Sequence, residues 1–141
     1  MKTAGAGLQR FVQAQDAVEA SVRDELAAGR KTGHWMWFVF PQLRGLGRSE
    51  MAWYFGIESR QEALAYWQHP VLGRRLQEYT ALALATLEKT AHDIFGTPDD
   101  LKFHSCMTLF AAVAPDEPLF KQALMRFFGG QLDEKTRALL V

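Results

Sequence analysis

The chain has 141 residues, 48% of them apolar, which is enough for one domain with a single core. Sixteen basic and sixteen acidic residues give a net charge of zero, which disfavours general binding to nucleic acid. No run approaches the roughly 18 consecutive apolar residues of a membrane span, and Cys106, the only cysteine, has no partner for an internal disulfide. We therefore expect a soluble, cytoplasmic protein with one domain over residues 1–141, of which residues 1–7 form a flexible tail.

Apolar residues recur at intervals of three and four in the N-terminal third of the chain, a spacing that predicts helices. The first predicted helix covers residues 8–26 and ends before Gly29. The aromatic segment GHWMWFVFPQ, residues 33–42, predicts a short helix between a cap at Thr32 and a stop at Pro41. A buried strand is the alternative interpretation of this segment.

Helix start signals continue along the middle of the chain. Ser59 and Glu62 have the spacing of a capping box, in which each side chain binds a free backbone N–H of the same first turn. Pro70 allows a further helix to begin, with apolar positions between residues 72 and 87. Gly73 within that helix indicates close packing against a neighbour.

The C-terminal third contains the clearest start signal, the sequence TPDD. Thr97 is the predicted cap, Pro98 the first helical residue, and the two carboxylates that follow favour the positive end of the helix. Pro118 and Gly129 delimit the next helix, and Asp133 caps the last. The chain thus predicts an all-α fold, a compact multihelical single domain of about six to eight helices.

Three motifs in this order, KTGHWMWFVFPQLRGLGRSE, EALAYWQHPVLGRRL and IFGTPDDLKFHSCMTLF, span much of the chain. They closely resemble a family of small, mostly bacterial proteins of unknown function, which sometimes carry the label calpastatin. The resemblance implies a multihelical fold and no established activity. A calpastatin-like inhibitor would be a disordered chain, which disagrees with so many core residues. The resemblance also implies that serine often occupies the position of Cys106, so a shared reaction through this thiol is not expected.

The sequence contains few signals of a metal site, a bound cofactor or a catalytic nucleophile. None of the four histidines has another histidine three or four residues away, so we expect no metal site and no cofactor. Ser105 and Cys106 interrupt an apolar helix, but no base can be assigned to either, and such residues usually bond back to helix carbonyls. Whether the protein is an enzyme stays open.

A small-molecule site is the function favoured by the residue types. The aromatic segment is mostly core, but Trp37 with neighbouring polar groups is typical of one wall of a pocket for a planar ligand. Lys102 has two interpretations, a cation for phosphate or carboxylate and a lysine whose stem packs on the core while its ammonium reaches water. Arg48 follows a glycine-rich turn that suits an anion, and a flexible connection is the alternative interpretation. The candidate ligand-binding residues are His34, Trp37, Gln42, Arg48, Lys102 and Ser105.

Two other classes of function compete with this interpretation. A protein–protein interaction module without catalysis would expose Trp53, Tyr54 and Trp67 to a partner protein or to a second copy of the chain. We therefore expect either a monomer or a homodimer. Nucleic-acid binding through Arg48, Arg74 and Arg75 is the weakest interpretation, because the net charge is zero.

Overall fold

The computed structural model describes residues 4–140, with side chains from Gly7 onward, and confirms the all-α class. Within this range the helices are α1 (Ala4–Asp16), α2 (Glu19–Ala28), α3 (Met36–Val39), α4 (Glu50–Tyr54), α5 (Arg60–Gln68), α6 (Leu72–Leu84), α7 (Ala91–Phe95), α8 (Asp99–Val113), α9 (Pro118–Phe128) and α10 (Glu134–Leu140). The predicted number of six to eight helices is too low, because the first predicted helix is two helices and the five-residue helix α7 was not predicted.

The expected tail over residues 1–7 falls outside the described residues at positions 1–3, and α1 begins at Ala4. The only pairing of extended segments seen in the described part is an isolated parallel bridge between Leu43 and Ile57. No helix within residues 4–140 combines the length and the apolar character that crossing a membrane requires.

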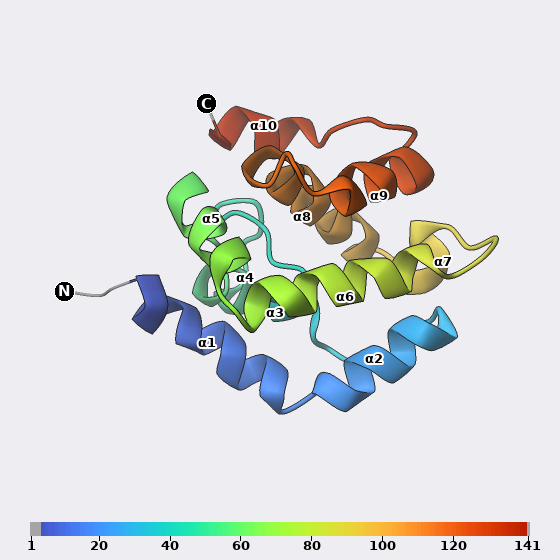
Figure 1. Cartoon of the computed structure of the whole chain (residues 1–141), viewed down its shortest axis with the longest axis horizontal. Helices are drawn as coiled ribbons and strands as arrows, with labels where there is room; N and C mark the ends of the chain where they lie inside the picture. The colour runs from blue at the N-terminus through green and yellow to red at the C-terminus, as the bar shows by residue number, and fades with distance from the viewer. Residues whose placement is uncertain (1–3, 141) are drawn as a thin grey trace.

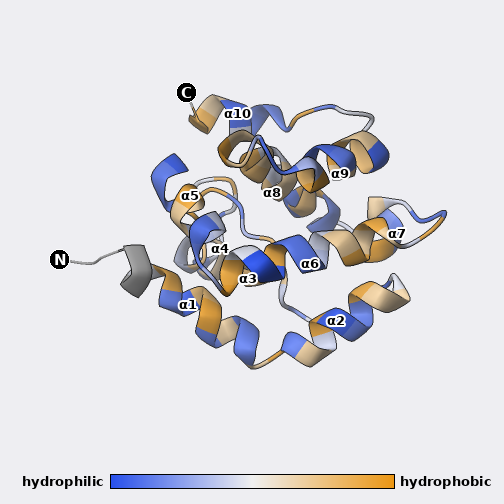
Figure 2. Ribbon diagram, viewed as in Figure 1, coloured by the Kyte–Doolittle hydropathy of each residue, from blue (hydrophilic) through white to orange (hydrophobic). Residues whose placement is uncertain are grey.

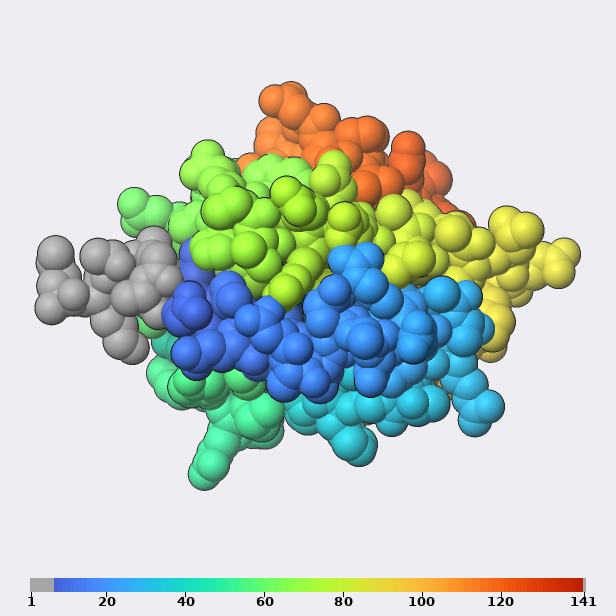
Figure 3. Space-filling model, turned by 60° about the horizontal axis from the view of Figure 1, so that its bottom comes forward, coloured from blue at the N-terminus to red at the C-terminus, as the bar shows by residue number. Residues whose placement is uncertain are grey.

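The predicted first helix is in fact two helices, broken at Ala17 and Val18. No glycine or proline marks the break. The buried amide of Gln15 donates to the carbonyl of Phe38 at 2.7 Å and to the Tyr66 hydroxyl at 3.0 Å, which ties the end of α1 to α3 and α5. Beyond the break α2 lies along α6, as Figures 1 and 3 show. One straight helix could not contact α3 and α5 with its first half and α6 with its second half. The break therefore depends on tertiary packing, which the apolar spacing of the sequence does not predict.

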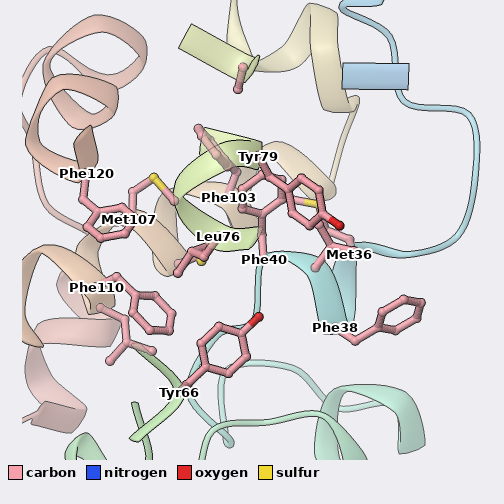
Figure 4. Close-up of a cluster of buried hydrophobic side chains, with 14 of the residues drawn as sticks. Met36, Phe38, Phe40, Tyr66, Leu76, Tyr79, Phe103, Met107, Phe110 and Phe120 are labelled. Carbon is pink, nitrogen blue, oxygen red and sulfur yellow. The ribbon is translucent and has the colours of Figure 1, made fainter. Parts of the chain in front are cut away.

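The core surrounds the long helix α8, which packs against α5, α7, α9 and α10 and is apolar along most of its length (Figure 2). Phe103 of α8 meets Phe40 edge to face at 5.1 Å and stacks on Phe95 at 4.6 Å between ring centroids. Figure 4 shows Phe40, Tyr79 and Phe103 gathered in this cluster. The aromatic segment 33–42 is thus mainly core, with Trp37 as its half-buried tryptophan, and it contains the short helix α3 rather than a strand.

The predicted cap at Ser59 and the predicted close packing at Gly73 are confirmed. Ser59 caps α5 by accepting from the backbone N–H of Glu62 at 3.1 Å, although the Glu62 carboxylate binds the N–H of Glu58 instead of closing the box. Gly73 lies so close to α5 that a Cβ would stand 2.0 Å from the carbonyl oxygen of Trp67. A side chain at this position would force α5 and α6 apart.

The predicted cap at Thr97 is wrong. Helix α8 begins at Asp99, Pro98 occupies the N-cap position, and the Thr97 hydroxyl lies 3.0 Å from Nδ1 of His92 on α7. The hydroxyl therefore binds a neighbouring helix rather than the first turn of α8. A local start signal located this helix to within two residues but not the atoms that begin it.

Candidate functional site

The segment between α2 and α3 is held by one carboxylate. Oε1 of Glu25 accepts from the backbone N–H groups of Thr32 at 2.7 Å and Gly33 at 2.9 Å, and from the indole N–H of Trp35 at 3.0 Å. Burial acts to raise the pKa of Glu25, but these three donors outweigh it and hold the pKa below its ordinary value. The segment is thereby fixed with Lys31 directed toward the start of α8.

Two lysines share a single carboxylate at this point. The Nζ atom of Lys31 lies 2.7 Å from one oxygen of Asp99, and that of Lys102 lies 3.3 Å from the other. The Lys31 side chain is only 8% exposed and also donates to the carbonyl of Gly33, so its ammonium is enclosed. The Lys102 side chain is 21% exposed, and its ammonium lies 4.8 Å from the centre of the Trp37 ring. Lys102 is thus the member of the pair that reaches solvent.

Lys102 lines a groove between α8, the loop before α4 and the start of α10. We call it the Lys102 groove, and its volume is about 530 Å³. Its lining residues are Gln42, Leu46, Gly47, Pro98, Leu101, Lys102, His104, Ser105, Asp133, Glu134 and Lys135. Lys102 and Gln42 also line a much smaller adjoining space of about 10 Å³, whose wall includes Trp37. The structure therefore brings Trp37, Gln42, Lys102 and Ser105 together from α3, the following loop and α8.

The far wall of the groove is a set of hydrogen bonds that we call the α8–α10 junction. One oxygen of Asp133 accepts from the Ser105 hydroxyl at 3.0 Å, from the backbone N–H of Thr136 at 3.1 Å and from the Thr136 hydroxyl. The backbone N–H of Asp133 donates to the Thr108 hydroxyl at 3.0 Å, which in turn donates to the carbonyl of His104 at 2.9 Å. The predicted cap by Asp133 is confirmed, and it is anchored to α8.

The structure places the other candidate residues differently. His34 and Arg48 are both exposed, and neither is among the residues that line the Lys102 groove. Arg48 directly follows Gly47, which does line it. Cys106 is fully buried, and burial raises the pKa of its thiol well above the ordinary value, so it is protonated at neutral pH.

Two important residues were not among the candidates derived from sequence. Lys31 and Asp99 form the centre of the charge cluster, and they are 68 positions apart in the chain. The available signals were weak: Asp99 belongs to the acidic first turn after Pro98, where it suits the helix dipole, and Lys31 is one polar residue beside the aromatic segment. Only the fold makes them neighbours.

The chemistry that these groups support is recognition of an anion. The Lys102 ammonium and the Gln42 amide line the groove, and Trp37 lines the adjoining space, while the Ser105 hydroxyl donates to the Asp133 carboxylate at 3.0 Å. Across residues 7–140 no three His, Cys, Asp or Glu side chains are close enough to hold a metal ion.

The fold defines a class of small all-α proteins, and comparison with protein families identifies the class. Residues 5–140 match the family described as "Protein of unknown function (DUF1810)", and the chain belongs to this family. Among solved structures it is similar to the conserved hypothetical protein Rv1873 from Mycobacterium tuberculosis, with 53% identity and a TM-score of 0.93. That similarity covers 94% of this chain and 95% of the other. The comparison with curated proteins gives no match.

Proposed function

We propose that the Lys102 groove binds a small anionic molecule, with a phosphorylated metabolite or a nucleotide-like compound as the best-matched class. The observation that carries this proposal is the sharing of Asp99 by Lys31 and Lys102. One carboxylate faces two ammonium groups, so the cluster keeps an excess of positive charge. Because Lys31 is enclosed, Lys102 is the group that presents this charge to a ligand.

The carboxylates on the opposite wall do not cancel this charge by binding Lys102. Asp133 already accepts three hydrogen bonds in the α8–α10 junction, and Glu134 lies 3.1 Å from the guanidinium of Arg137. Lys135, also on this wall, has no carboxylate within ion-pair distance in the described part of the chain. The groove therefore offers cations at both walls, while its acidic groups have other partners.

The remaining lining suits an organic ligand with an apolar part. The half-buried amide of Gln42 makes no side-chain hydrogen bond to residues 7–140 and can serve a ligand as donor or acceptor. Leu46, Leu101 and Pro98 supply apolar surface beside it. A volume of about 530 Å³ lies within the ordinary range for small-molecule sites.

The test is isothermal titration calorimetry of the purified protein with pyrophosphate, AMP and ATP, repeated on variants of matched chemistry. Lys102→Gln removes the presented charge, and we expect it to weaken binding by about tenfold. Ser105→Ala changes the same wall at a hydroxyl that is already engaged, and Lys121→Gln removes an exposed lysine on α9. Both should leave affinity within about twofold, because neither group is free to bind a ligand at this groove.

Arg48 belongs to the proposal as the residue next to Gly47 of the groove lining, and His34 as an exposed residue of the segment that carries Trp37. Their exposed positions allow only screened, long-range attraction, so Arg48→Gln and His34→Gln should each weaken binding by less than about threefold. The proposal fails if none of the three probes binds at millimolar concentration, or if Lys121→Gln weakens binding as much as Lys102→Gln.

An interaction surface is the second candidate, supported by the exposed aromatics of α4. Trp53 is 62% and Tyr54 56% exposed, and the guanidinium of Arg44 covers one face of Trp53 at 4.5 Å. Trp67, in contrast, is half-buried against Phe120 and does not belong to this surface. Light scattering after gel filtration tests the version with a second copy: a monomer for both the wild type and Trp53→Ser would eliminate it.

A further inference from the structure

A second groove lies where the start of α5 meets the outer side of α8 and the last helix. Its volume is about 360 Å³, and its exposed lining is largely apolar. Ala111 and Ala112 of α8 form one wall, and Leu132 and Leu140 form the other. Arg60 and Arg137 also line it, and we call it the Arg60 groove. It has no lining residue in common with the Lys102 groove.

The groove exists because α8 carries small residues at this level. Thr108, Ala111 and Ala112 of α8 line the groove, and their side chains are all small. The α8–α10 junction prevents the chain from filling this space, since Asp133 holds the start of α10 against Ser105 and Thr108. An apolar wall stays open to solvent as a result.

Both charged groups at this groove are cations, and one of them lacks an acidic partner. Arg60 donates to the carbonyl of Ala112 at 3.3 Å and has no carboxylate within ion-pair distance among the described residues. Arg137 lies 3.1 Å from Glu134 of the same helix, so Arg60 is the cation at this groove that has no carboxylate partner among the described residues. Apolar walls beside the guanidinium of Arg60 complement a molecule with a hydrocarbon part and one negative charge.

We propose that the Arg60 groove binds a small amphipathic carboxylate, a compound with an alkyl or aryl tail and a single carboxyl group. The tail packs between the alanines of α8 and the leucines of the last segment. The carboxylate accepts hydrogen bonds from Arg60, whose planar guanidinium has donors left after the bond to Ala112. This ligand class differs from the phosphorylated compounds proposed for the Lys102 groove, and the two sites are independent.

The proposal is tested by calorimetric titration of the full chain with octanoate, and with acetate and 1-octanol as probes that lack the tail or the charge. Octanoate should bind at least about tenfold more tightly than either, because each probe omits one half of the recognition. Arg60→Gln should weaken octanoate binding by about tenfold through loss of a charge-assisted hydrogen bond. Ala111→Leu should abolish binding by filling the groove.

Two controls separate this site from the rest of the surface. Arg74→Gln removes an exposed arginine of α6, and Lys102→Gln alters the other groove; neither should change octanoate affinity by more than about twofold. Far-UV circular dichroism and thermal unfolding report whether Ala111→Leu is folded, and Arg60→Gln, at an exposed position, decides the question if it is not. Absence of octanoate binding at millimolar concentration, equal binding of 1-octanol, or full affinity in Arg60→Gln would overturn the proposal.

Discussion

Helix α8 carries polar side chains in two places, and they are used in opposite ways. At its start Asp99 is divided between Lys31 and Lys102, and Lys102 reaches the groove with charge to spare. One turn further along, Ser105 and Thr108 are buried, and every hydrogen bond that they make stays within the protein. Polar residues within an apolar helix can therefore mark either a binding site or a structural contact such as the α8–α10 junction. The difference lies in whether the polar group is already satisfied.

Asp133→Ala is the substitution with the largest expected effect on the α8–α10 junction. It removes the acceptor for Ser105, for the backbone N–H of Thr136 and for the Thr136 hydroxyl, so we expect unfolding free energy to fall by about 3 kcal/mol. Urea unfolding followed by circular dichroism measures this loss. Asp116→Ala is the matched control, since within residues 7–140 the exposed Asp116 side chain makes no hydrogen bond or ion pair. An equal loss in both variants would contradict a special role for the junction.

Glu25, like Asp133, is a carboxylate whose hydrogen bonds are all made within the protein, and it makes the stability of the fold depend on pH. Its pKa is lowered in the folded protein, so its contribution to stability is complete above the ordinary glutamate value of about 4.3 and is lost as pH falls through the folded pKa. Glu25→Gln should reduce unfolding free energy by about 2 kcal/mol at neutral pH, because three N–H donors lose a charged acceptor.

Urea unfolding of wild type and Glu25→Gln between about pH 7 and about pH 3 tests whether the contribution of Glu25 to stability decreases as the pH falls. The difference in unfolding free energy between the two proteins should shrink as the pH falls, since protonation removes the same charge that the substitution removes. A difference that stays constant over this range would mean that Glu25 acts through its shape alone.

Asp99→Asn sharpens the contrast, because it should move stability and binding in opposite directions. The enclosed Lys31 loses its partner, and the unfolding free energy should fall by about 1 kcal/mol, between the values for exposed and buried pairs. Lys102 is no longer neutralised, so affinity for pyrophosphate should rise about fivefold. Calorimetry and urea unfolding measure the two effects. A fall in affinity would show instead that Asp99 positions the lysine for its ligand.

Much of the helical organisation follows from local sequence, and the joints between helices do not. The cap at Ser59, the close approach at Gly73 and the stop at Gly129 were predicted because each depends on a few neighbouring residues. The break between α1 and α2 was not, because it depends on Gln15 reaching Phe38, 23 positions away.

The candidate site divides in the same manner. Residue types favoured Trp37, Gln42 and Lys102, and these three do meet around one small space. Ser105 was included for its polarity, yet its hydroxyl belongs to the α8–α10 junction. Lys31 is not among the candidate ligand-binding residues, although it shares Asp99 with Lys102. The functional groups of a chain can be identified from its sequence. Whether each group already has a hydrogen-bond partner depends on the residues that the fold places next to it.

Composition, apolar period and turn residues were sufficient for an all-α domain whose aromatic segment is mainly core, because helix propensity, capping and burial act over a few residues. The tertiary structure alone decided which polar groups remain available. Lys31 and Asp99 lie 68 positions apart, and Ser105 and Asp133 lie 28 apart, so their pairing depends on how α8 packs against its neighbours. A charge shared between two lysines and a hydroxyl held by a carboxylate are both consequences of that packing.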